Sequence, residues 1–225
     1  SKKIHLATIL GTFQSTLTNF PYISEEWKKN CEEERLLGVS ITGQWDCPIV
    51  GNKSVLKKLR DKAVSVNKIY AKKFGVSQSL AVTCVKPSGT VSQLADAASG
   101  LHPRYSPYYI RRVRISATDS LFKMLKDQKM PYCPEVGQSY SDATSYIFEF
   151  PIKAPKSAAY SKDLTAIEQL ERWKLVKENY TEHNPSVTIN IGKNEWLEAA
   201  NWVYSNWDIV GGLSFLPRED YVYPM

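Results

Sequence analysis

Apolar and polar residues alternate along the chain with two different periods, which predict helices that alternate with strands. Between residues 53 and 74 the apolar residues recur every three or four positions, which places them on one face of a helix. Gly75 follows this segment and ends the predicted helix. Residues 80–85 form a nearly continuous apolar run rich in β-branched side chains, which predicts a strand covered on both faces.

The same alternation extends over the rest of the chain. Helices are predicted at residues 5–18, 25–37 with Ser24 as the N-cap, 164–180 and 194–206, and also from about Gly89 and after a cap at Thr118 or Asp119. Strands are predicted at residues 39–42, 108–115, 145–150, 186–191 and 212–216. Because parallel neighbours need crossover connections, this order predicts an α/β fold on a parallel sheet or barrel.

Composition places the chain among folded proteins and narrows its chemistry only slightly. With 225 residues and 43% hydrophobic residues it is expected to form one compact unit. No apolar run approaches the roughly 20 residues that cross a bilayer, and no signal-like segment follows Lys3, so a cytoplasmic protein without a membrane partner is expected. The four cysteines form no CxxC pair, which predicts reduced structural thiols and no metal site. The formal charge of +6 favours anionic partners without choosing among them.

The most informative local pattern is a strand, a turn of small residues and a helix. The predicted strand 80–85 leads through Lys86 into a loop that consists of Pro87, Ser88, Gly89, Thr90 and Val91. Free amides at the start of a helix bind phosphate oxygens, a glycine allows close approach of a ligand, and hydroxyls add hydrogen bonds. The plainer alternative is a turn in which Ser88 or Thr90 only caps the helix.

Longer stretches around this loop carry a resemblance to a known family. Residues 84–103, continued by residues 104–114, are similar to the adenosylcobalamin-dependent, class II ribonucleotide reductases. Residues 6–18, 33–43 and 180–188 resemble the monomeric ribonucleoside-triphosphate reductases of that class, and the segments 195–197 and 212–217 extend the match. The resemblance therefore covers nearly the whole chain.

The resemblance implies a ten-stranded α/β barrel made of two half-barrels. The chain, taken as a single unit of residues 1–225, would supply the second half, with leading helices in 1–38 and a βα half-barrel in 39–217. The family converts ribonucleoside triphosphates to deoxyribonucleotides for DNA synthesis. Its adenosylcobalamin generates a thiyl radical that abstracts the ribose 3′-hydrogen, and an external dithiol such as thioredoxin restores the enzyme. Pro87, Ser88, Gly89, Thr90 and Val91 would hold the substrate phosphates.

The departures from the family pattern concern its catalytic cysteines. The radical cysteine lies in an Asn-Pro-Cys-Gly-Glu-like loop that does not occur here, and the C-terminal cysteine pair is also absent. We therefore expect no catalytic residue in this chain, no activity of the chain alone, and a need for the upstream half of the barrel as partner. An excised piece and a natural, non-catalytic partner of a split barrel remain open.

The remaining candidate residues have structural alternatives. His102 is a possible nucleotide or cobalamin contact or a structural hydrogen-bonding residue, and His183 is expected to organise a loop. Cys84 is expected to be a buried, inert thiol. The basic, aromatic segment 104–114 suggests a rival function as a module that binds single-stranded nucleic acid. Alternation along a strand would instead divide its arginines between two faces.

Overall fold

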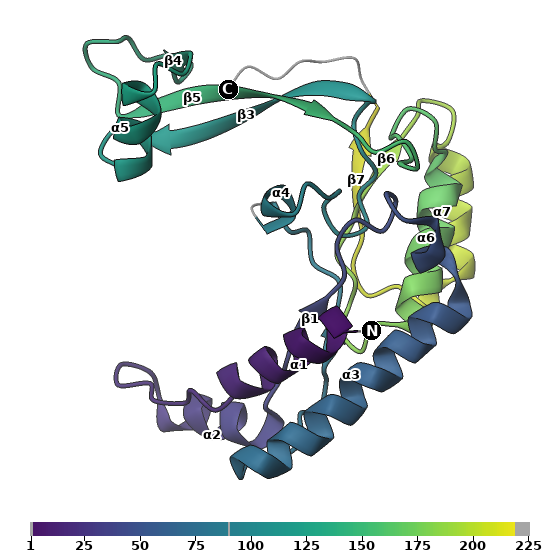
Figure 1. Cartoon of the computed structure of the whole chain (residues 1–225). Helices are drawn as coiled ribbons and strands as arrows, with labels where there is room; N and C mark the ends of the chain where they lie inside the picture. Colours follow the sequence, from purple (N-terminus) through teal and green to yellow (C-terminus); the bar gives the residue numbers. More distant parts are fainter. Residues whose placement is uncertain (1, 90, 219–225) are drawn as a thin grey trace. The chain divides into compact units, whose positions relative to one another are not determined.

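The computed structural model of the chain describes residues 2–89 and 91–218 (Figure 1). Contacts divide the described residues into two compact units, where the sequence analysis expected one. Unit 1 comprises residues 2–104 and 157–218, and unit 2 comprises residues 105–156. Within the described residues no helix combines the length and the apolar character needed to span a membrane.

The helices α1 (Lys2–Gln14) and α3 (Lys53–Phe74) lie side by side and run in the same direction in Figure 1. A buried hydrogen bond of 3.1 Å from Asn67 Nδ2 to Thr12 Oγ1 joins them. The opposite side of α1 leaves large apolar side chains exposed, namely those of Leu6, Leu10 and Phe13. The helix α1 thus packs on the rest of unit 1 through Ile4, Thr8 and Thr12, whereas Leu6 and Leu10 stay exposed and Phe13 contacts Phe74 at the end of α3.

Capping geometry confirms the predicted bounds of α3 (Lys53–Phe74) and the predicted start of the next helix at Ser24, whereas α1 and that second helix end before the predicted residues 18 and 37. Asn52 Oδ1 accepts from Ser54 N at 2.9 Å at the start of α3, and Gly75 ends it with a left-handed φ of 71°. Ser24 caps α2 (Glu25–Glu34), as predicted, by accepting from Trp27 N at 3.4 Å. Local sequence therefore determines both ends of α3 and the start of α2, whereas α2 ends at Glu34 because Arg35, and not the predicted Gly38, takes the left-handed conformation there, with a φ of 47°.

Four short strands of unit 1 form two parallel pairs. The strand β1 (Val39–Ser40) pairs with β2 (Thr83–Cys84), and β6 (Thr188–Ile191) pairs with β7 (Ser214–Pro217). A main-chain hydrogen bond of 3.0 Å from Ser186 N to Val85 O connects the two pairs. The parallel arrangement agrees with the sequence prediction for these strands. The predicted half of a ten-stranded barrel stays a prediction.

Both β1 and β2 are shorter than predicted, and each strand has its own reason. The chain leaves the direction of β1 at Gly43, whose φ is 69°. On β2 the amides of Val82 and Thr83 donate to the carboxylate of Glu182, at 2.8 and 3.2 Å, in place of a neighbouring strand. A side chain thus takes over main-chain donors that a longer ladder would have used.

The core of unit 1 is built by two helices packed on β6. They are α6 (Ala166–Asn179) and α7 (Trp196–Ser205), which lie next to each other in Figure 1. Trp173 of α6 is fully buried, and its Nε1 donates to Pro185 O at 2.8 Å. A capping box between Thr165 and Glu168 starts α6. Short 3-10 helices at Pro48–Gly51 and Trp207–Ile209 complete the described elements of this unit apart from α4 (Val91–Leu94).

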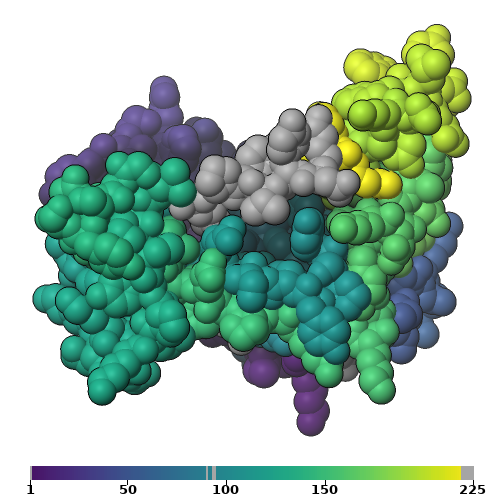
Figure 2. Space-filling model, turned by 90° about the horizontal axis from the view of Figure 1, so that it is seen from above, coloured from purple at the N-terminus to yellow at the C-terminus, as the bar shows by residue number. Residues whose placement is uncertain are grey.

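The aromatic residues of α7 and of the segment after it differ in their burial. Trp202 is buried against Trp173, with ring centroids 6.3 Å apart. Tyr204 and Trp207 are exposed instead, and so is Trp196 to a smaller degree. Figure 2 shows the yellow-green surface of the segment to which these residues belong.

Unit 2 is an antiparallel sheet with one helix, which corrects the prediction that all strands run parallel. The strand β5 (Ser145–Lys153) lies between β3 (Tyr108–Ser116) and β4 (Tyr132–Pro134), and α5 (Ser120–Asp127) packs on the sheet through Phe122. Of the two predicted caps, Thr118 and Asp119, the structure has Asp119 as the N-cap of α5. The chain turns at Lys129 (φ 59°) into β4, which the sequence analysis did not find, and then returns as β5.

Candidate functional site

The loop predicted to bind phosphate lies between β2 and α4 in unit 1. Lys86 N donates to Ser40 Oγ at 3.1 Å, and Ser92 N donates to Ser88 O at 3.1 Å. Pro87, Gly89 and Val91 are exposed, whereas Ser88 is half-buried. Thr90, the remaining predicted contact, lies outside the described residues. The helix α4 has only four residues, so its dipole adds little to the free amides at its start.

Thr42 contacts the loop from the segment that follows β1. Its Oγ1 lies 2.9 Å from Ser88 Oγ, 2.8 Å from Ala98 O and 3.1 Å from Gly100 N. The sequence analysis did not identify this residue. A signal was present, because Thr42 falls within the segment 33–43 that carries part of the family resemblance, but its distance of 46 positions from Ser88 hid the contact.

Gly100 brings a second stretch of backbone against the loop. Its φ is 55°, and a Cβ at this position would lie 2.4 Å from Lys86 O. Only a residue without a side chain fits such a contact at this φ. Residues 98–100 therefore support the start of the loop by direct backbone contact.

A buried ion pair holds this supporting stretch. The guanidinium of Arg104, whose side chain is 3% exposed, lies 3.0 Å from Asp46 Oδ2 and 3.1 Å from Asp96 Oδ1. The same Asp46 Oδ2 accepts from Ala98 N at 2.7 Å. Asp96 has a left-handed φ of 43°, a conformation that costs energy outside glycine and that the Arg104 contacts hold in place. The chain from Asp96 to Ala98 is thus held by Arg104 and Asp46.

Both histidines of interest bond to the main chain. His102 Nδ1 lies 2.9 Å from Ser99 O, and its Nε2 accepts from Thr188 N at 3.0 Å. This geometry favours the structural alternative for His102, and its contact with nucleotide or cobalamin stays a prediction. His183 Nε2 lies 2.8 Å from Leu37 O, which agrees with its predicted role in organising a loop.

Cys84 lies at the end of β2 and is 6% exposed. Burial raises the pKa of its thiol, and the charge of Lys86 and a hydrogen bond from Ser40 oppose this only in part. The predicted buried, inert thiol is therefore consistent with the structure. Cys47 and Cys133 are exposed instead, so they do not share that environment. Among the described residues no group of three or more potential ligands could hold a metal ion.

Thiol labelling tests these environments. At neutral pH iodoacetamide is expected to modify Cys47 and Cys133 quickly and Cys84 only after unfolding, because the thiolate is the reactive form and burial disfavours it. Peptide mass spectrometry over time in buffer and in denaturant measures the order. Modification of Cys84 in the native chain at the rate of Cys133 would contradict a buried thiol.

The arginines of β3 do not form one basic patch. Exposure alternates along the strand, as the sequence analysis expected. Arg112 Nε lies 2.8 Å from Glu149 Oε1, and an Arg114 nitrogen lies 2.8 Å from Glu135 Oε1. Carboxylates thus neutralise two of these charges, which weakens the rival interpretation as a nucleic-acid-binding surface.

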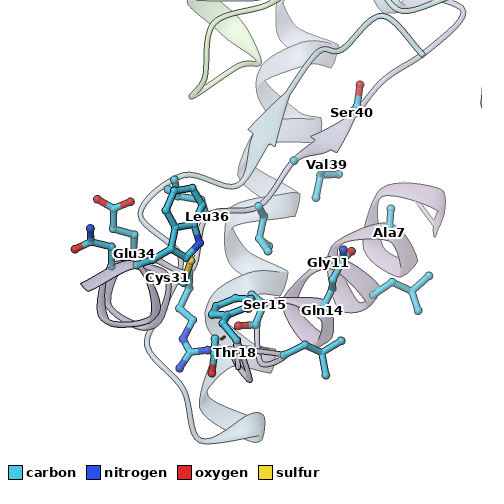
Figure 3. A pocket seen from close by; sticks show the side chains of 18 residues that line it. Ala7, Gly11, Gln14, Ser15, Thr18, Cys31, Glu34, Leu36, Val39 and Ser40 are labelled. Carbon is cyan, nitrogen blue, oxygen red and sulfur yellow. Dashed lines mark hydrogen bonds between the residues drawn. The ribbon is translucent and has the colours of Figure 1, made fainter. Parts of the chain in front are cut away.

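A cavity of about 780 Å³ opens between α1, α2 and β1. Figure 3 shows Gly11 and Gln14 of α1, and Thr18 beyond the end of α1, opposite Cys31 and Glu34 of α2, with Val39 and Ser40 of β1. The lining is mostly apolar, and it reaches Ser40, whose hydroxyl bonds to Lys86 N.

The fold is that of the class II ribonucleotide reductases. A crystal structure of a B12-dependent (class II) ribonucleotide reductase superimposes with a TM-score of 0.81 and 22% sequence identity, over 98% of this chain and 35% of the solved chain. No family model matches the sequence.

Sequence comparison agrees with the fold. The adenosylcobalamin-dependent ribonucleoside-triphosphate reductase of Lactobacillus gasseri is 26% identical over 93% of this chain and 32% of its own length. The enzyme of the same name from Euglena gracilis is 34% identical over 67% of this chain and 20% of its own length. The chain belongs to the adenosylcobalamin-dependent ribonucleotide reductase family and spans about a third of the length of its Lactobacillus gasseri relative.

Proposed function

We propose that the chain is the substrate-phosphate-binding part of an adenosylcobalamin-dependent ribonucleoside-triphosphate reductase. The observation that carries this proposal is the similarity to reductases of that name over 93% of the chain. The phosphate loop, Pro87 to Val91, lies within the segment of strongest resemblance, and its described residues are accessible. The triphosphate form of the substrate follows from the names of these relatives.

The loop offers donors suited to phosphate oxygens. A Cβ added to Gly89 would meet nothing within 4 Å, so a ligand can approach the backbone there. Ser88 adds a hydroxyl, and the exposed Lys86 adds a positive charge beside the loop. Together these groups bind and orient the phosphates, while the thiyl radical chemistry depends on cysteines that this sequence does not contain.

Adenosylcobalamin, when bound, supplies the radical that starts the reaction in such enzymes. The described residues do not fit this group by themselves. The cavity of about 780 Å³ lies within the range of sites for drug-sized ligands, and cobalamin is larger. His102 uses both ring nitrogens for main-chain hydrogen bonds. We therefore derive no step through the cofactor, and a contact of His102 with nucleotide or cobalamin stays a prediction.

The proposal extends to the architecture of the complete enzyme. Within residues 39–217 the parallel strands of unit 1 belong to the second half of the ten-stranded barrel, with residues 105–156 inserted as the antiparallel unit 2; the segment 1–38 supplies leading helices, and the upstream half completes the barrel. The two parallel strand pairs support this arrangement. An external dithiol such as thioredoxin serves as reductant, and the enzyme acts in the cytoplasm in DNA synthesis.

Substitution of Gly89 tests the loop. Gly89→Val is expected to weaken binding of ATP by the chain roughly tenfold, because the new side chain occupies the space through which the phosphate approaches the backbone. A tenfold weaker affinity corresponds to the loss of about one hydrogen bond to a charged group. Isothermal titration calorimetry measures the affinity. The free energy of unfolding should change little, since a Cβ at this position meets nothing within 4 Å.

Ala200→Val, on the exposed side of α7, is the matched control for added bulk. Unchanged ATP affinity in Gly89→Val would refute the loop as a phosphate site. A filter-binding titration on single-stranded DNA at two salt concentrations distinguishes the phosphate site from the rival function as a nucleic-acid-binding module. The rival function requires that DNA binding depends steeply on salt and is retained in Gly89→Val.

A further inference from the structure

We propose that Thr42 is a positioning residue that sets the direction of the Ser88 hydroxyl when the loop binds a phosphate. The inference rests on the proposed function of the loop. It concerns a residue that lies outside the loop and that reaches it only through the fold. Its basis is the distribution of hydrogen atoms among the three partners of the Thr42 hydroxyl.

A threonine hydroxyl has one hydrogen to donate and two lone pairs that accept. Thr42 Oγ1 donates to Ala98 O at 2.8 Å, and Gly100 N donates to Thr42 Oγ1 at 3.1 Å. One lone pair is left for the third partner, Ser88 Oγ at 2.9 Å. With this assignment the Ser88 hydroxyl must donate its hydrogen to Thr42 Oγ1. Only the lone pairs of Ser88 Oγ are then available to other partners.

A bound phosphate requires the opposite orientation of Ser88. Phosphate oxygens are acceptors, so the Ser88 hydroxyl must turn its hydrogen to the ligand. Thr42 can then redirect its own hydrogen from Ala98 O to Ser88 Oγ. Ala98 O remains satisfied, because Gly43 N also donates to it at 2.7 Å. Two hydroxyl rotations complete the change, and no covalent bond forms or breaks.

The surroundings keep Thr42 where it can make this exchange. Ala98 is held from its other side by Asp46 Oδ2, which accepts from Ala98 N at 2.7 Å. Asp46 in turn is bound to the buried Arg104. Thr42 therefore has a fixed acceptor, Ala98 O, and a hydroxyl partner that can rotate, Ser88 Oγ. When Thr42 turns its hydrogen from Ala98 O to Ser88 Oγ, the Ser88 hydroxyl is oriented toward the phosphate.

A double-mutant cycle on the full chain tests this inference, with inorganic triphosphate as the calorimetric probe. Ser88→Ala and Thr42→Val are each expected to weaken binding, by roughly tenfold and roughly fivefold, because each removes one contribution to a charge-assisted hydrogen bond. Thr42→Ser keeps the hydroxyl and should retain affinity within about twofold of the unmodified chain. In the Ser88→Ala background, Thr42→Val should add less than about twofold, since it acts through Ser88.

The outcomes separate the two levels of the argument. Full additivity of Ser88→Ala and Thr42→Val, or no effect of Thr42→Val, overturns the role of Thr42 while the loop keeps its proposed function. No effect of Ser88→Ala contradicts Ser88 as a phosphate contact and removes the basis for Thr42 as well. If Thr42→Val does not fold, Thr42→Cys takes its place in the cycle, because a thiol donates and accepts only weakly; an unchanged affinity in Thr42→Cys would likewise overturn the inference.

Discussion

Replacing Arg104 by Ala is expected to lower the free energy of unfolding of unit 1 by about 3–5 kcal/mol, the usual cost of breaking a buried ion pair. Asp46, 12% exposed, would keep its charge without its partner, and Asp96 would lose the contacts that hold its left-handed conformation. Chemical denaturation followed by tryptophan fluorescence measures the change. All six tryptophans lie in unit 1, so the signal reports that unit.

Lys29→Ala is the matched control. Lys29 forms an exposed ion pair with Glu33 at 3.8 Å in the same unit, and such pairs contribute about 0–1 kcal/mol. A loss in Arg104→Ala no larger than that in Lys29→Ala would mean that the Asp46–Arg104 pair does not hold the stretch that supports the loop.

Gly100→Ala is expected to have an effect of similar size, roughly 2–5 kcal/mol of unit 1 stability. The left-handed φ of 55° contributes about 1–2 kcal/mol for a residue with a Cβ. The remainder comes from overpacking, typically about 1–3 kcal/mol, because the new atom would lie 2.4 Å from Lys86 O. Since backbone rather than a flexible side chain is in the way, the phosphate loop itself has to shift.

Gly75→Ala separates these two contributions. Gly75 also has a left-handed φ, of 71°, but a Cβ there meets nothing within 4 Å. It should therefore lose only the conformational part, about 1–2 kcal/mol, in the same fluorescence experiment. Equal losses in the two variants would show that the contact between Gly100 and Lys86 contributes nothing.

The elements that local patterns determine were predicted well. The helix α3 has the predicted bounds, because its apolar stripe, its Asn52 cap and its terminal Gly75 are all local signals. The strand β3 and its alternating exposure were also expected. The direction in which strands pair is a property of the whole fold. The antiparallel return of β5 through the short strand β4 therefore had no signal in a single sequence.

The candidate site was likewise predicted only where its residues are close together in the sequence. The loop at Ser88 and Gly89 stood out because small residues between a strand and a helix form a local pattern. Thr42 and Asp46 did not, because their contacts with Ser88 and Arg104 join positions 46 and 58 residues apart. Exposed Cys47 and Cys133 were likewise grouped with buried Cys84, since burial of a single thiol depends on tertiary packing.

The bridge between Arg104 and Tyr160 has a consequence for how this sequence can vary. Arg104 N donates to Ala159 O at 3.0 Å, and Ser161 N donates to Arg104 O at 2.8 Å. The chain therefore leaves unit 1 and re-enters it at adjacent positions. The entropy of closing a loop grows only slowly with its length, so unit 2 can gain, lose or exchange residues at small thermodynamic cost. A change in the length of residues 105–156 therefore leaves the pairing of the parallel strands beside the phosphate loop in place.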